Sequence, residues 1–231
     1  MLTLIKKPKH PTVITAFPGF GLVGTIAVEF LIEHLRTEYI GRISTKDEVP
    51  VVAIHDGKLV EPIAVYYSRQ YNIVLVRSVN KISKNFSEIS EAFHEMEEEL
   101  SVKEFVSLDG VNSPSGSSEI FFFCKERANE KEYEALGLKP LKEGIIIGAT
   151  ALLLSELKNI NCLFAETQSD LPDSKTSAEL IKLLDKKFDL KVDYTPLYET
   201  AKKFEAKLKQ VMEKSKVLED EQEKKKLNYV G

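Results

Sequence analysis

Three glycines near the start of the chain have the spacing of a dinucleotide-binding fingerprint. Gly19, Gly21 and Gly24 follow a run of β-type residues, 13–17. In that fingerprint the glycines allow a tight turn and a close approach to a pyrophosphate, which lies at a helix N-terminus. The alternative is that Pro18, Gly19, Gly21 and Gly24 only turn the chain and let a helix pack closely on a strand. Pro18 at the strand end, and a hairpin signal in place of a further β-α-β unit, favour this structural role.

Acidic side chains follow two of the expected strands. Asp109 comes directly after the apolar run 105–108, and Glu166 and Asp170 follow the run 162–165. Open α/β sheets bind ligands at the carboxyl ends of their strands, and a pair of carboxylates can act as general acid and base. However, acidic residues are also common in such turns for backbone reasons, and no histidine accompanies them. The residues therefore give no strong catalytic signal, and we predict no catalytic residue.

The composition points away from metals, nucleic acids and membranes. The two cysteines, Cys124 and Cys162, are too few for a zinc site or a disulfide framework, so we predict neither a metal nor a cofactor. Lys and Arg total 32 against 36 for Asp and Glu, which argues against a general nucleic-acid binder. The longest mainly apolar run, 145–154, is about half of a membrane span. We expect a reduced, cytoplasmic protein.

The elements that position these residues alternate between strand and helix, which predicts an α/β fold with a mainly parallel sheet flanked by helices. Apolar runs predict strands at 13–17, 39–43, 73–77, 105–108, 120–124, 145–147 and 162–165. Apolar stripes predict helices at 23–36, 87–100, 129–136 and 149–158, and one ending near 188. Asn129 is expected to cap the third of these, and Gly137 to end it. Asp56-Gly57 predicts a β-hairpin, and Pro62 an edge or bulged strand in its second arm.

The last part of the chain differs from the core. Thr195-Pro196 predicts the start of a long helix reaching about Lys226, and 16 of the 28 residues from 199 to 226 are charged. A narrow apolar seam at heptad spacing runs along it, through Phe204, Leu208 and Val211. The helix either packs on its own core or projects and pairs with neighbouring subunits. We divide the chain into an α/β core domain, 1–195, and a C-terminal helical arm with its tail, 196–231.

Five segments, in order, carry a family resemblance: 17–24, 61–66, 143–156, 165–173 and 192–197. Together they resemble the proteasome assembly chaperone family, especially its archaeal Pba-type members, over about residues 10–210. The resemblance implies a core related to nucleoside phosphorylases, without established catalytic residues. It also implies a homo-oligomer and a C-terminal helix whose tail docks on the ring of proteasome α subunits. Because fold does not fix function, the phosphorylase-like core is not an argument for an enzyme.

By this resemblance Leu227, Tyr229, Val230 and Gly231 form the partner-binding tail. Docking tails of this kind end in a hydrophobic residue, Tyr and one further residue, whereas Tyr229 is third from last here. One extra residue displaces the terminal carboxylate by up to about 3.5 Å. Tyr229 therefore docks in a shifted register, or the tail uses another site.

The leading hypothesis from the sequence is a non-enzymatic, homo-oligomeric chaperone or adaptor that binds the proteasome α-ring or its assembly intermediates. One alternative is a nucleotide- or phosphate-binding enzyme or sensor that uses the loop Gly19–Gly24. Another is an oligomeric scaffold for a different partner.

Overall fold

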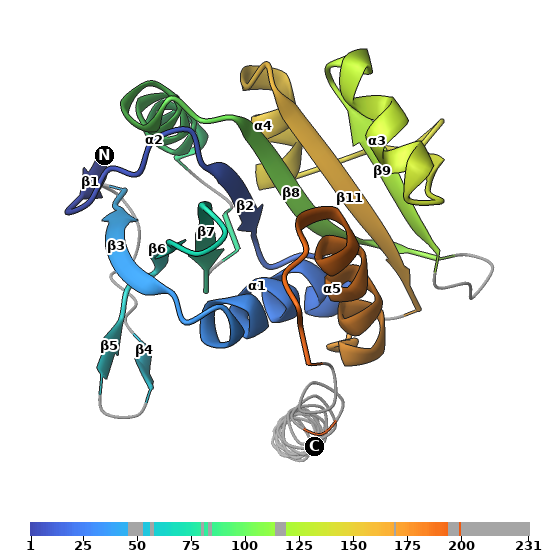
Figure 1. Ribbon diagram of the computed structural model, residues 1–231, viewed down its shortest axis with the longest axis horizontal. Coiled ribbons are helices and arrows are strands. Elements are labelled where there is room, and N and C mark those ends of the chain that lie inside the picture. Colours follow the sequence, from blue (N-terminus) through green and yellow to red (C-terminus); the bar gives the residue numbers. More distant parts are fainter. Residues whose placement is uncertain are drawn as a thin grey trace, which may run out of the picture.

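The computed structural model describes residues 1–45, 53–55, 58–79, 81–82, 85–113, 119–168, 170–193 and 199. The predicted α/β fold is confirmed: nine strands of the described chain form one sheet, in the order β1-β3-β6-β7-β2-β8-β11-β9-β10 (Figure 1). Its strands are β1 (Leu2–Leu4), β2 (Thr12–Ala16), β3 (Glu38–Ile43), β6 (Ile63–Ser68), β7 (Ile73–Ser78), β8 (Glu104–Asn112), β9 (Ile120–Cys124), β10 (Lys139–Pro140) and β11 (Ile160–Thr167). The helices are α1 (Val23–His34), α2 (Phe86–Leu100), α3 (Glu130–Ala135), α4 (Ala149–Glu156) and α5 (Ser174–Phe188).

The sheet is mixed, so the prediction of a mainly parallel sheet holds only for its middle. Strands β7, β2, β8 and β11 run parallel to one another, and β10 runs parallel to β9. The pairs β1–β3, β3–β6, β6–β7 and β11–β9 are antiparallel. The link from β6 to β7 spans only residues 69–72, which is too short for the crossover that a parallel pair requires. A run of apolar residues alone does not reveal this direction.

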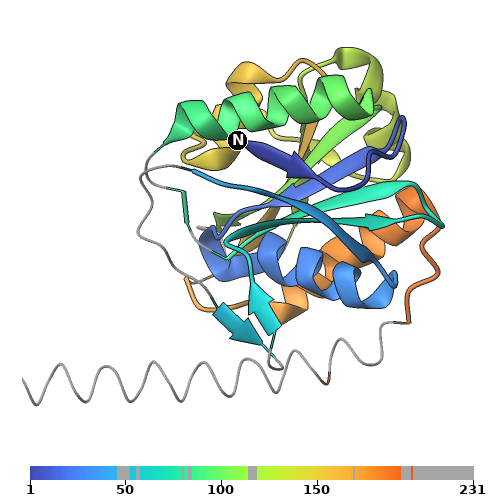
Figure 2. The same cartoon turned by 90° about the vertical axis from the view of Figure 1, so that its left-hand side faces the viewer.

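Helices cover both faces of the sheet and bury two apolar cores. Figure 2 shows α2 on one side of the sheet and α1 with α5 on the other. On the α1/α5 face, side chains such as Ile14, Leu75 and Val106 pack against α1 and α5. On the opposite face, Val13 and Phe105 pack with residues of α2 and α4. Successive strand residues point to opposite faces, and the two central strands β2 and β7 are buried along their whole length.

The predicted hairpin is present as a separate pair of short strands. β4 (Ala53–His55) pairs antiparallel with β5 (Lys58–Val60), while Asp56 and Gly57 lie outside the described residues. The prediction that Pro62 makes the second arm an edge or bulged strand holds for β5, which forms one edge of this two-stranded sheet, but not for β6. Pro62 lies between β5 and β6, and β6 is an interior strand between β3 and β7. The proline breaks the apolar run in two instead of lying inside one strand.

The strand predicted at 145–147 is wrong. These residues have no regular structure: Ile146 packs against the α2/α4 core, whereas Ile145 and Ile147 are 93% and 75% exposed. The sheet offers no position for such a strand, because β11 is already paired on one side with β8 and on the other with β9. The short strands β1 and β10, which the sequence did not predict, occupy its two edges.

The helices match their predicted positions closely. α2 begins one residue before the expected start, and α3 is followed by Gly137 at φ +88°, a left-handed conformation that glycine adopts without strain. Asn129 precedes α3 as expected, but its side chain donates to Asn159 and Asn161 instead of capping the helix. The predicted arm and tail, 196–231, lie outside the described residues except for Glu199.

Candidate functional site

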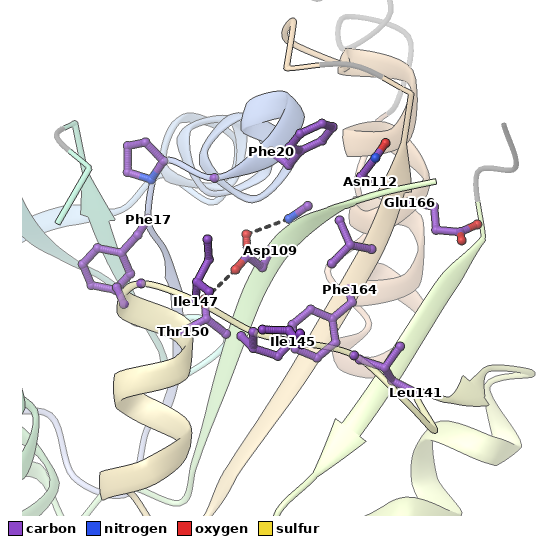
Figure 3. A pocket seen from close by; sticks show the side chains of 18 of the residues that line it. Phe17, Phe20, Asp109, Asn112, Leu141, Ile145, Ile147, Thr150, Phe164 and Glu166 are labelled. Carbon is purple, nitrogen blue, oxygen red and sulfur yellow. Dashed lines mark hydrogen bonds between the residues drawn. The ribbon is translucent and has the colours of Figure 1, made fainter. Parts of the chain in front are cut away.

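A cleft of about 720 Å³ opens at the carboxyl ends of β2, β8 and β11 (Figure 3). Its walls are the turn 17–20 after β2, the end of β8 at 109–112, the segment 141–150 that leads into α4, and side chains of β9 and β11. This volume falls within the range of small-molecule sites, and the position is where open α/β sheets bind ligands. The structure therefore brings together the turn at Gly19 and the carboxylates of Asp109 and Glu166, but not Asp170, which is exposed and outside the lining.

The glycine loop packs directly on the end of β8. A Cβ added to Gly19 would overlap the carboxylate of Asp109, and one added to Gly24 would overlap the backbone carbonyl of Leu108. Gly110 approaches the loop from the other side, since its Cβ would overlap the carbonyl of Phe20. The close approach that these glycines allow is therefore to groups of the protein itself.

Gly21 is fixed by a second set of contacts. Its φ is +62°, and its carbonyl accepts a hydrogen bond from the backbone N–H of Asp173 at 2.9 Å. The Asp173 carboxylate in turn accepts bonds from the hydroxyls of Thr167 at 2.8 Å and Thr176 at 2.7 Å, and from the Thr176 N–H at 2.9 Å. Asp173 was not predicted from the sequence as a functional residue. Its position directly before the apolar stripe of α5 is an N-cap signal that could have identified it.

Asp109 is a half-buried acid of the cleft whose carboxylate is held by hydrogen bonds. Its carboxylate accepts hydrogen bonds from the Thr150 hydroxyl and the Gly110 N–H, both at 2.8 Å, and Thr150 also lies 3.4 Å from the Ser107 hydroxyl. Burial raises the pKa of Asp109, and these two hydrogen bonds oppose that shift, as does the more remote charge of Lys81. Among the described residues, no cation forms an ion pair with Asp109. Thr150, in the first turn of α4, carried no sequence signal for this role.

The chemistry available here is binding and proton exchange. A carboxyl group of raised pKa can accept or release a proton, but no histidine, lysine or cysteine of the described chain hydrogen-bonds to Asp109. Both cysteines are buried, and burial raises the pKa of Cys124 to about 12. No group of three or more His, Cys, Asp or Glu within the described ranges is placed to hold a metal ion. Within the same ranges, no helix is both long and apolar enough to cross a membrane.

The predicted partner-binding residues are not placed by the structure. Leu227, Tyr229, Val230 and Gly231 all lie outside the described residues. The cleft and the predicted tail are thus two separate candidate sites.

Comparison with known proteins identifies relatives over most of the chain. The sequence model of the PAC2 family matches residues 13–212. The protein MJ0106 of Methanocaldococcus jannaschii is 30% identical over 212 residues, which cover 89% of this chain and 87% of that protein. The crystal structure of PbaA from Pyrococcus furiosus, described as an archaeal homolog of proteasome-assembly chaperone, is 27% identical, with a TM-score of 0.82 over 92% of this chain and 97% of PbaA.

A more distant structure shares the fold. PbaB of Pyrococcus furiosus, described as an archaeal proteasome activator, is 20% identical, with a TM-score of 0.76 over 92% of this chain and 98% of PbaB. The likeness therefore extends across the described α/β core.

Proposed function

The chain belongs to the PAC2 family, and we propose that it is a non-enzymatic, homo-oligomeric assembly factor that binds proteasome α subunits or their assembly intermediates. The observation that carries this proposal is the likeness to PbaA, which spans nearly the whole of both chains at 27% identity. PbaA is described as a homolog of a proteasome-assembly chaperone, so a role with the proteasome is the nearest assignment for this chain as well.

In this proposal the two parts of the chain have different tasks. The core, 1–195, is an oligomeric platform, and residues 196–231 are an arm that presents Leu227, Tyr229, Val230 and Gly231 to the α-ring. A helical arm limits the conformational entropy lost on docking to the last few residues. Several tails on one oligomer add avidity without any new contact.

Self-association of the core is supported by apolar side chains on its surface. Phe123 is exposed, and Leu152 and Leu154 of α4 are partly exposed. Exposed apolar patches of this kind commonly mark protein interfaces. Two buried, unpaired cysteines fit a protein of the reducing cytoplasm.

For Pro18, Gly19, Gly21 and Gly24 we propose a structural role. The positions that a phosphate would approach are taken by the Asp109 carboxylate, the Leu108 carbonyl and the Thr167 side chain. An anionic ligand beside Asp109 would also meet a like charge. These contacts disfavour the alternative of a nucleotide- or phosphate-binding enzyme or sensor.

The test measures binding of the full-length chain to purified α-ring. Tyr229→Ala is expected to weaken binding at least about tenfold, because a buried tyrosine at an interface hot spot contributes about 2 kcal/mol or more. The matched control is Asn228→Ala, which changes the neighbouring side chain and is expected to bind within about twofold of the parent. The free energy of unfolding of the core is expected to be the same in all three proteins.

Two outcomes would contradict parts of this proposal. Equal binding by the parent and Tyr229→Ala would move the contact from the tail to the globular face. A full-length chain that binds neither the α-ring nor single α subunits would remove the proteasome role altogether.

A further inference from the structure

The cleft holds a charge that its own residues do not pair. The Asp109 carboxylate is half-buried, and it accepts hydrogen bonds from the Thr150 hydroxyl and the Gly110 amide. A buried carboxylate normally has an opposite charge beside it, because desolvation without a partner is costly. Lys81 lines the same cleft and its charge acts on Asp109, but no described cation lies within ion-pair distance of this carboxylate.

A second carboxylate faces the same space. In the register of β8 and β11, Asp109 is opposite Phe164, and Glu166 lies two residues further along β11. Asp109, Phe164 and Glu166 therefore share the face that α4 covers, and the strand spacing and rise put the two acidic Cβ atoms about 8 Å apart. Figure 3 shows both carboxylates at the cleft, which Phe164 also lines. A cation in the cleft therefore meets one acid on each of these two neighbouring strands.

The remaining lining is acidic and apolar. Its described charged residues are Asp109, Glu143 and Glu166 against one cation, Lys81. Phenyl rings and aliphatic side chains supply most of the surface, among them Phe20 and Phe121 and the exposed Ile145 and Ile147. An aromatic face attracts a cation, and the isoleucines gain only when something covers them.

We propose that this cleft binds a small organic cation, a protonated amine on an aromatic or branched apolar body. The ammonium group lies between Asp109 and Glu166 and supplies the charge that Asp109 lacks. The apolar body rests on Phe20 and Phe121 and covers Ile145 and Ile147. This site is independent of the proposed α-ring contact, which uses the other end of the chain.

The experiment is calorimetric titration of the full-length chain with three probes that share one apolar body. Phenethylammonium is expected to bind with a Kd below about 1 mM, which is reasonable for a ligand of its size. The neutral 2-phenylethanol is expected to bind at least tenfold more weakly, and the anionic phenylacetate not measurably. Equal affinity for the ammonium and the alcohol, or no binding of the ammonium at 10-fold higher concentration, would overturn the proposal.

Variants locate the binding. Glu166→Gln and Asp109→Asn keep the shape of each side chain and remove its charge, so each is expected to weaken phenethylammonium binding at least tenfold. The matched control is Glu126→Gln, an exposed acid outside the cleft, which is expected to leave the affinity unchanged. A loss in either cleft variant that the control does not show supports the site. If both cleft variants bind phenethylammonium as tightly as the parent, the amine binds elsewhere and the proposal is wrong. Glu166→Gln alone still tests the proposal if Asp109→Asn folds poorly.

Discussion

Two polar clusters lie at opposite ends of β8 and β11. One is buried and contains its own countercharge, whereas the other faces a cleft. At the amino ends of β8 and β11, Glu104 and Asn161 are buried together with Lys187 of α5, and we call these three residues the amino-end cluster. At the carboxyl ends, Asp109 faces the open cleft. The clusters also lie on opposite faces of the sheet, because Glu104 and Asp109 are five residues apart in one strand.

The amino-end cluster contains its own countercharge. The side chain of Lys187 is 1% exposed, and its ammonium lies 2.7 Å from a carboxylate oxygen of Glu132 and 3.5 Å from one of Glu104. It also lies 4.6 Å from the ring centre of Tyr133, and the Asn161 amide donates to Glu104 at 2.8 Å. Lys187 is thus held by opposite charge and by an aromatic face.

The comparison separates a structural cluster from a binding site. Each end holds a carboxylate, buried at Glu104 and half-buried at Asp109, but only at the amino end does the fold supply the cation and exclude solvent. At the other end the fold supplies neutral donors and leaves a cleft where the cation would be. A buried charge that the chain does not pair is the kind of feature that functional sites tolerate and structural clusters do not.

The largest change in the free energy of unfolding is expected from removing the countercharge of the amino-end cluster. Lys187→Met keeps most of the apolar stem but leaves Glu104 buried without its cation, so it is expected to lower the free energy of unfolding by about 3–5 kcal/mol. The control is Lys182→Met in the same helix, because Lys182 pairs with Glu179 at the surface and is expected to matter by less than about 1 kcal/mol. Chemical denaturation measures both. Equal losses in the two variants would show that the amino-end cluster is not held by its buried charges.

A smaller loss is expected from the packing that shapes the cleft. Gly110→Ala brings a methyl group against the Phe20 carbonyl, which is backbone and cannot move aside by a rotamer change. Such overpacking is expected to lower the free energy of unfolding by about 2–3 kcal/mol. The control is Gly144→Ala, also in the lining, whose new Cβ would come no closer than 3.5 Å to Leu141 and is expected to change stability by less than about 0.5 kcal/mol. Similar denaturation midpoints for Gly110→Ala and the parent would contradict the close packing of loop and strand.

The two ends also differ in how far the sequence revealed them. The cleft was partly predictable, because Gly19 and Asp109 each follow an apolar strand and the ends of parallel strands meet at one edge. Their contact was not predictable, because only the fold brings the backbone of Gly19 so close to the Asp109 carboxylate that no side chain fits between them. The amino-end cluster could not be predicted from the sequence. Glu104 and Lys187 are far apart in the chain, and each looks like an ordinary surface charge next to an element end.

The elements of the fold also differ in how well the sequence predicted them. Helices such as α2 were predicted almost to the residue, because an apolar stripe at helical spacing is a local signal. Strand partners are not local. β9 comes after β8 in the chain but pairs with β11, and that pairing is what leaves 145–147 without a place in the sheet. The exposed isoleucines of the cleft therefore follow from sheet order, which the apolar run alone does not encode.

The smallest effect is expected from Asp109 itself, and its sign depends on pH. Burial raises the pKa of Asp109, so the native state holds this proton more tightly than the unfolded chain does. The resulting stabilisation is fully present below the unfolded pKa and is lost as the pH rises through the higher native pKa. Asp109→Asn does not titrate, and its amide can still accept from Gly110 and donate to Thr150. From acid to neutral pH, the free energy of unfolding of the parent is therefore expected to fall relative to that of the variant, by no more than about 1 kcal/mol.

Denaturation of both proteins from about pH 4 to pH 8 measures this difference, with the exposed substitution Asp189→Asn measured beside them as a control. If the difference in the free energy of unfolding between Asp109→Asn and the parent does not change with pH, ionisation of Asp109 does not destabilise the native state, and this prediction is wrong. Loss of a charge is thus expected to have opposite effects at the two ends of the strands. It lowers the free energy of unfolding at the amino-end cluster and raises it at the cleft.

A bound ammonium at the cleft supplies the cation that Lys187 supplies at the amino end. Saturating phenethylammonium is therefore expected to stabilise the parent more at pH 8 than at pH 4, and to leave Asp109→Asn nearly unaffected at both.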